Sequence, residues 1–146
     1  MMKIATKYHG QCEIEEKHIF VFEQGIPGFL DEKRFVLLPF AETPIVILQS
    51  VQTPELGFAM VNPFLYFPDY DFELDECSVS QLQLSAEKEV VVYVILTVAD
   101  PFEKTTANLQ APVVLNSEKK LGKQVILTNT SYRTKHRLFA NRVEAK

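Results

Sequence analysis

The sequence predicts an all-β fold: a small single-domain β-barrel-like fold of short, mostly antiparallel strands, with one short helix near residues 75–84. Short runs rich in β-branched and aromatic residues recur at the spacing typical of barrels and sandwiches. Prolines fall mostly at the ends of these runs, where a missing backbone N–H costs least. The 146 residues are enough for one domain, which we place at residues 1–140, with 141–146 as a flexible C-terminal tail.

The strand candidates follow one another along nearly the whole chain. One of them is continuously apolar from Val90 to Val98, and its density of β-branched residues favours a strand covered on both faces over a buried helix. We expect strands at Lys3–Tyr8, His18–Phe22, Phe35–Phe40, Ile45–Val51, Gly57–Val61, Phe64–Phe67, Tyr70–Leu74, Glu89–Ala99, Ala111–Asn116, Lys123–Thr128 and Tyr132–Phe139.

Two connections have recognisable local chemistry. Gly25-Ile-Pro-Gly-Phe29 fits a type II turn, with Pro27 at the second position and Gly28 at the position that requires a positive φ. The segment from Asp75 to about Leu84 is the helix candidate, because Asp75 or Ser78 can cap its first turn. No repeat or linker interrupts the chain.

Composition excludes several classes of protein. The net charge of −4 and the isoelectric point of about 5.4 argue against a general nucleic-acid-binding protein, which carries a basic surface. The longest apolar run, from Val90 to Val98, is far shorter than the roughly 20 residues of a membrane-spanning helix. The first ten residues lack the apolar stretch of a signal peptide. We therefore expect a soluble cytoplasmic protein that does not contact a membrane.

The net charge conceals an asymmetry along the chain. The residues before Ser117 include seven basic and 17 acidic side chains, a net charge of −10, whereas Ser117–Lys146 carry +6. Within the acidic part, carboxylates alternate with apolar residues, so a strand there would have one anionic and one apolar face. Such a strand is either a charged edge strand or a docking surface for a basic partner. The alternating acids are Asp69, Asp71, Glu73 and Asp75.

Aromatic residues gather immediately before these acids. The chain has 11 Phe, five Tyr and no Trp, and five of the rings fall between Pro63 and Phe72. One strand face cannot bury all of them. We expect the core to take most of these rings and one or two to remain at the surface as an apolar patch beside the acids.

A catalytic constellation is not recognisable in the sequence. The histidines His9, His18 and His136 have no metal-ligand spacing, and Cys12 and Cys77 form no CxxC pattern. There is no G-x-S-x-G elbow and no glycine-rich phosphate loop. We expect no enzymatic activity, no catalytic residues, no metal and no cofactor.

Eight blocks of sequence, in order and at the expected separations, together carry a family resemblance. They are Lys7-Tyr-His-Gly10, Gly25-Ile-Pro-Gly-Phe29, Phe35-Val-Leu-Leu-Pro39, Leu48-Gln-Ser-Val51, Pro63-Phe-Leu-Tyr-Phe-Pro-Asp-Tyr70, Thr105-Thr-Ala-Asn-Leu-Gln-Ala-Pro112, Lys123-Gln-Val-Ile-Leu127 and Tyr132-Arg-Thr-Lys-His136. The chain resembles the flagellar assembly factor FliW family from Lys3 to about Leu138. Cys12 and Cys77 are the most notable departures from the family pattern.

The resemblance implies a non-catalytic protein with two alternative partners. One is flagellin, held in the cytoplasm before export. The other is CsrA, an RNA-binding translational repressor, which the free protein would bind and antagonise beside its RNA-binding surface, so that repression of flagellin translation is lifted. We expect a monomer that does not contact nucleic acid directly.

We assign candidate partner-binding residues to two segments. The first combines acids and rings and would attract the basic repressor. The second would lie near a groove for an amphipathic segment of flagellin. The candidates are Phe64, Tyr66, Phe67, Asp69, Tyr70, Asp71 and Glu73 in the first segment, and Asp100, Phe102 and Asn108 in the second.

Two other classes remain open at this stage. A nucleic-acid-binding β-barrel could use the basic C-terminal part, with Tyr132 and Phe139 as stacking platforms. A small-ligand-binding β-barrel would require a deep cavity lined by polar groups, and a filled barrel would weaken that alternative.

Overall fold

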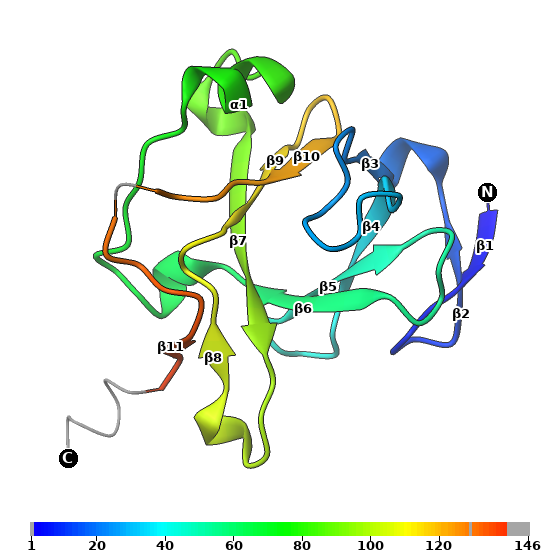
Figure 1. Ribbon diagram of the computed structural model, residues 1–146. Helices are drawn as coiled ribbons and strands as arrows, with labels where there is room; N and C mark the ends of the chain where they lie inside the picture. Colours follow the sequence, from blue (N-terminus) through cyan, green and yellow to red (C-terminus); the bar gives the residue numbers. More distant parts are fainter. Residues whose placement is uncertain (1, 129, 140–146) are drawn as a thin grey trace.

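Seven strands form a closed ring in the described part of the chain (Figure 1). The structure is a computed structural model that describes residues 2–128 and 130–139. In chain order each strand of the ring pairs with the next, and the last strand pairs with the first, which closes the ring. All of these pairs are antiparallel except one, in which Leu121 faces Val21 in parallel. The ring consists of β3 (Phe20–Val21), β4 (Arg34–Pro39), β5 (Val46–Ser50), β6 (Gly57–Val61), β7 (Val90–Thr97), β9 (Val113–Asn116) and β10 (Leu121–Gln124).

Two smaller groups of strands complete the sheet structure, one that extends the ring and one that is separate from it. The end of β7 pairs with β8 (Thr106–Ala107), which in turn pairs with β11 (His136–Arg137). A separate hairpin joins β1 (Met2–Ala5) and β2 (Gln11–Ile14). In Figure 1 the β8–β11 pair and the β1–β2 hairpin lie on opposite sides of the molecule. The predicted all-β, barrel-like fold of short, mostly antiparallel strands is therefore confirmed.

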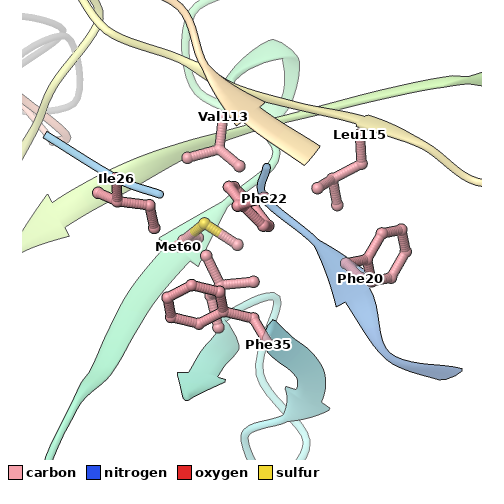
Figure 2. Close-up of a cluster of buried hydrophobic side chains, with 8 residues drawn as sticks. Phe20, Phe22, Ile26, Phe35, Met60, Val113 and Leu115 are labelled. Carbon is pink, nitrogen blue, oxygen red and sulfur yellow. The ribbon is translucent and has the colours of Figure 1, made fainter. Parts of the chain in front are cut away.

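Side chains fill the interior of the ring. Phe22, Phe35 and Met60 are fully buried and converge inside the ring (Figure 2). Phe35 belongs to β4 and Met60 to β6, and Phe22 directly follows β3. A Cβ atom at Gly122 would lie 2.4 Å from the Phe22 ring, so glycine is what allows β10 to approach this core. The buried cluster is Phe20, Phe22, Ile26, Phe35, Leu48, Met60, Val113 and Leu115.

Two predicted strands are absent. Phe64–Phe67 was expected as a strand, but the chain forms the 3₁₀ helix η2 (Pro63–Leu65), because the Asn62 side chain accepts a hydrogen bond from the Phe64 N–H at 2.9 Å and Pro63 suits the first helical position. Tyr70–Leu74 was also expected as a strand, but it pairs with no described strand. Its side chains nevertheless alternate between the interior and solvent, as the sequence pattern indicates.

Other differences are smaller. The first half of β7, Val90–Tyr93, is only partly buried, so the expectation of cover on both faces is wrong there. The strands β2 and β8 lie outside every predicted run. Among the remaining predicted runs, Gly57–Val61 is confirmed with the predicted bounds as β6, and each of the others overlaps a strand whose bounds are shorter or shifted. The predicted tail at 141–146 lies outside the described residues.

The predicted helix is present as α1 (Glu76–Gln81), which is shorter than expected. Asp75 caps it: the carboxylate accepts hydrogen bonds from the Ser78 N–H at 3.3 Å and from the Ser78 hydroxyl at 2.6 Å. These hydrogen bonds lower the pKa of Asp75. The helix ends before Gln83 because that residue takes a left-handed conformation, with φ at 52°.

The remaining described helices are single 3₁₀ turns: η1 (Glu16–His18), η3 (Glu87–Glu89) and η4 (Phe102–Lys104). No helix in residues 2–128 and 130–139 has the length and apolar character needed to cross a membrane.

Candidate partner-binding surface

Tyr70 is the centre of a network of rings at the β11 side of the molecule. Its ring lies 4.7 Å from Tyr132, 5.5 Å from Phe72 and 5.9 Å from Phe64, measured between centroids. Its hydroxyl donates a hydrogen bond to the Leu109 carbonyl at 2.7 Å, and burial raises the pKa of the phenol. Tyr70 is only 4% exposed. It therefore organises the surface from below and is not free to contact a partner, which corrects its assignment as an anchor.

The neighbouring helix η2 presents apolar side chains to solvent. Phe64 is 45% exposed and Leu65 is 65% exposed. Tyr66 and Phe67 are half-buried, because Tyr66 packs on Phe139 and Phe67 packs on His136. Among the four aromatic side chains predicted in this segment, Phe64 is thus the most exposed to solvent. We did not select Leu65 from the sequence, although the Asn62-Pro63 pair was a signal that the strand alternation would break here.

The loop after β7 joins the same surface. The Phe102 ring is 40% exposed and lies 5.5 Å from Phe139, which also contacts Tyr66. Asp100 is exposed beside it, and Val98 adds a further exposed apolar side chain. The structure therefore brings Phe102 next to the η2 region, although the two are far apart in sequence.

Asn108 is half-buried and has a structural role, while its assignment as a contact residue stays a prediction. Its side-chain oxygen accepts hydrogen bonds from the backbone N–H groups of Gln110 and Ala111, at 3.2 and 3.1 Å. These bonds close a turn between β8 and β9. The acceptor is used within the chain and is not offered to a partner.

The predicted acids lie on the outer side of the segment that follows η2. Asp69, Asp71 and Glu73 are all exposed. Within residues 2–128 and 130–139 the structure records an ion pair only between Lys17 and Glu15, so these three carboxylates have no cationic partner there. In the chain they follow η2 after the three residues 66–68.

A basic segment borders these acids. The Asp71 N–H donates a hydrogen bond to the Tyr132 hydroxyl at 3.0 Å, which ties the acidic segment to the residues leading into β11. Arg133, Lys135 and Arg137 follow Tyr132 and are exposed. This end of the molecule is therefore zwitterionic, with an acidic and a basic strip side by side, and the sequence reasoning did not anticipate that contact.

His136 anchors the basic segment. Its Nε2 atom accepts a hydrogen bond from the Arg133 N–H at 2.9 Å, and its ring packs against Phe67 and Tyr132. Burial, together with the Arg133 charge, lowers the pKa of His136 below its ordinary value of 6.5. The neutral imidazole is the form that can accept this hydrogen bond.

Groups with catalytic potential do not converge at this surface. Across the described residues, no group of three or more His, Cys, Asp or Glu side chains is arranged to hold a metal ion. Cys12 is half-buried and Cys77 is exposed, and both are free thiols. What the surface offers is charge, exposed apolar area and hydrogen-bonding groups, which are the components of a protein–protein contact.

Comparison with known proteins assigns the family. The sequence matches the family model described as FliW protein over residues 3–138. The chain belongs to the FliW family. It is 67% identical over 142 residues to a flagellar assembly factor FliW of Geobacillus kaustophilus (strain HTA426), covering 97% of this chain and 99% of that protein. A flagellar assembly factor FliW of Bacillus subtilis (strain 168) is 52% identical over 136 residues, with 92% and 95% covered.

A solved structure of the family has the same fold. The crystal structure of the flagellar assembly factor FliW aligns with a TM-score of 0.91 at 66% identity and covers 94% of this chain and 96% of that one. The FliW family relationship predicted from the eight sequence blocks is confirmed, and the closed barrel is the fold of the family.

Proposed function

We propose that this FliW-family protein is a non-catalytic flagellar assembly factor with two alternative protein partners. It binds flagellin in the cytoplasm. When flagellin is exported and the protein is free, it binds the translational repressor CsrA and relieves repression of flagellin translation. It acts as a monomer and does not contact RNA itself. The relatives support the general role, because they carry the name of an assembly factor, which describes no reaction.

One observation supports the proposal most strongly: unpaired acids adjoin exposed apolar side chains in a single short stretch. Asp69, Asp71 and Glu73 follow the exposed Phe64 and Leu65 within one stretch of ten residues. A repressor that grips RNA phosphates presents Lys and Arg, and carboxylates without a cationic partner would attract that surface. The adjacent apolar side chains supply area to be buried on contact.

The flagellin site is proposed on the neighbouring loop. Phe102 and Val98 are exposed there and continue the apolar surface of η2. An amphipathic helix of an export substrate would lay its apolar face on such a surface. The rings of Phe102, Phe139 and Tyr66 form one group, and Phe64 contacts Tyr70 in a second group. Because Tyr66 directly follows η2, which carries Phe64, we expect the two partner sites to lie close together and the two partners to exclude each other.

A competition experiment tests the proposal. Purified protein is immobilised, saturated with CsrA, and then titrated with flagellin, with the order reversed in a second series. We expect each partner alone to bind and each to displace the other. Failure of both to bind refutes the function. Simultaneous binding at full affinity refutes the exclusive switch while leaving the two interactions in place.

The basic strip keeps nucleic-acid binding as the second candidate. Arg133, Lys135 and Arg137 follow Tyr132 in the chain and are exposed, as basic residues of a phosphate-binding segment would be. A gel shift with the protein alone separates the candidates, because steeply salt-dependent RNA binding would favour this function. The filled interior of the ring weakens the small-ligand alternative.

A further inference from the structure

A groove of about 800 Å³ opens away from the ring network, beside α1. One side is the segment that continues β10, Gln124–Thr128. The other side is Phe72–Asp75 together with Ser78 of α1. In Figure 1 the orange chain leaving β10 runs below α1 toward the green segment that climbs to it. The volume is within the range of about 300–1,000 Å³ in which proteins commonly take up small ligands or short peptide segments.

The Gln124–Thr128 segment is an open strand edge. The Val125 N–H donates to the Pro112 carbonyl at 2.9 Å, and the Leu127 N–H donates to the Gln110 carbonyl at 2.8 Å. Successive N–H groups of an extended chain point to opposite sides, so those of Ile126 and Thr128 point away from this neighbour. Neither has a backbone acceptor among the described residues. On that side β10 pairs with β3 only at Leu121, so the edge beyond has no partner strand within residues 2–128 and 130–139.

The edge lacks the devices that protect exposed strands. Gln124-Val-Ile-Leu-Thr128 contains no charged residue and no proline, and the Ile126 side chain is 52% exposed. Natural edges of this kind are usually blocked by a charge, a bulge or a covering element, because they readily pair with another chain. An open apolar edge beside a groove is consistent with a surface that is meant to be paired.

The side chains around the groove indicate the chemistry of the occupant. Val125 and Leu127 pack with Phe72 and Leu74 and give it an apolar floor. The Lys123 ammonium is held by the Ser78 hydroxyl at 3.0 Å and the Gln81 amide oxygen at 2.5 Å, so the basic lining residue is already engaged. Glu73 is exposed on the rim and has no cationic partner in residues 2–128 and 130–139. The groove is therefore apolar below and anionic at the rim.

We propose that Gln124–Thr128 binds an extended peptide segment of a partner protein as an added β-strand, with apolar and basic side chains alternating along that segment. Its main chain would pair with Ile126 and Thr128. Its basic side chains would lie on the face covered by Phe72–Asp75, near Glu73, and its apolar side chains would lie on the opposite face, beside the exposed Ile126. The site shares Phe72 and Glu73 with the surface described above, but its pairing edge, Gln124–Thr128, is not part of that surface. It goes beyond the proposed function, because it does not depend on which protein supplies the strand.

A synthetic peptide tests the site directly. The probe is acetyl-Lys-Val-Lys-Val-Lys-Val-amide, added to the full-length protein while backbone amide signals are followed by NMR. We expect the Ile126 and Thr128 amides to shift and become protected from solvent exchange, whereas those of Val125 and Leu127, already bonded, should change little. A matched peptide should lose binding if the backbone nitrogens that face the protein are N-methylated, since these nitrogens can then donate no hydrogen bond.

Two protein variants complete the test. Ile126→Pro removes the edge N–H and should weaken the peptide about tenfold or more, whereas Ile126→Ala keeps it and should stay within about threefold. Equal binding of the N-methylated peptide, or no shift of either amide, overturns the proposal. Protection of the Ile126 and Thr128 amides before peptide is added also overturns the proposal. If the protein is then a monomer, its own chain covers the edge. If it forms a concentration-dependent dimer, a second copy covers the edge. These outcomes report pairing at the Gln124–Thr128 edge, whereas binding of CsrA or flagellin is measured separately by the competition experiment.

Discussion

At the scale of single residues, the turn at Gly25–Phe29 shows two glycines kept for different reasons. Gly28 has a φ of 87°, and the Phe29 N–H donates to the Ile26 carbonyl at 2.6 Å, as a type II turn requires. Gly25 has a φ of 67°, and a Cβ there would lie 2.5 Å from the Leu30 carbonyl oxygen. A Cβ at Gly28 would meet no atom within 4 Å. Only Gly25 is constrained by both conformation and space.

This pair gives a prediction. Gly28→Ala should lower the free energy of unfolding by about 1 kcal/mol, the cost of a left-handed conformation for a residue with a side chain. Gly25→Ala should lower it by about 2–4 kcal/mol, because a backbone clash adds to that cost. Urea unfolding followed by circular dichroism measures both. Equal losses of unfolding free energy in the two variants would contradict this prediction, because they would show that the backbone around Gly25 moves to accommodate a Cβ atom at no cost.

His136 predicts how stability responds to acid. Because its pKa is lowered in the folded state, the unfolded chain binds the proton more tightly. Its contribution to stability is therefore complete above about pH 6.5 and is lost as the pH falls through the lowered folded value. The physical event is loss of the hydrogen bond that Nε2 accepts from the Arg133 N–H.

The control is His136→Gln, whose amide oxygen can accept the same bond without titrating. Urea midpoints measured at about pH 7.5 and about pH 5 should fall more for the unchanged protein than for this variant, because other acid-sensitive groups are shared. A larger fall for His136→Gln would contradict the assigned role of the imidazole.

At the scale of elements, the segment from Tyr70 to Asp75 separates what a local pattern encodes from what it does not. Alternation correctly predicted that Tyr70, Phe72 and Leu74 face the interior while the acids face solvent. It wrongly predicted a strand, because strand pairing needs a neighbour with a free edge, and that neighbour is decided by the rest of the fold. Likewise, nothing near Tyr70 in sequence shows that Tyr132 and Leu109 would meet it.

Local capping chemistry could be predicted from the sequence. Asp75 was one of two caps suggested for the helix, and it is the one that caps α1. Ser78, the alternative, is instead buried and donates to Asp75. The choice between them depends on which side of the helix packs against β10, where the Lys123 ammonium contacts Ser78.

Removal of this cap should destabilise the protein measurably. Asp75→Ala should lower the free energy of unfolding by about 1 kcal/mol, and Asp75→Asn should lower it less, since an amide oxygen still accepts from the Ser78 N–H. Glu76→Ala, an exposed change in the same turn, should have a smaller effect of a few tenths, about 0.3 kcal/mol. Urea titration ranks the three. An Asp75→Ala protein as stable as the unchanged chain would show that α1 is held by packing alone.

At the scale of the whole molecule, the sequence predicted the barrel-like fold and the family better than it predicted the surface. The charge asymmetry between the two parts of the chain is visible in the sequence, but its spatial consequence is not. In the folded protein the Asp71 N–H donates a hydrogen bond to the Tyr132 hydroxyl, and this bond brings the basic segment that begins at Arg133 close to the acidic segment. It also places Phe102 in the same ring network as Tyr66. Both contacts join segments far apart in sequence, so local pattern reasoning could not find them.

The central claim is that the acids beside η2 attract a basic protein partner. Asp71→Lys with Glu73→Lys reverses two of them. The control, Glu13→Lys with Glu55→Lys, changes the net charge equally in β2 and in the β5–β6 turn, which lie away from β11 (Figure 1). All four side chains are exposed, so the fold should tolerate both variants.

The most direct measurement is the affinity of purified CsrA for these three proteins by calorimetry at low and at physiological salt. We predict that the Asp71 and Glu73 reversal weakens binding about tenfold or more and flattens its salt dependence, because the acids must lie within about 8 Å of the partner's charges to act. The control should stay within about threefold of the unchanged protein. Equal affinity and equal salt dependence in all three would contradict the account.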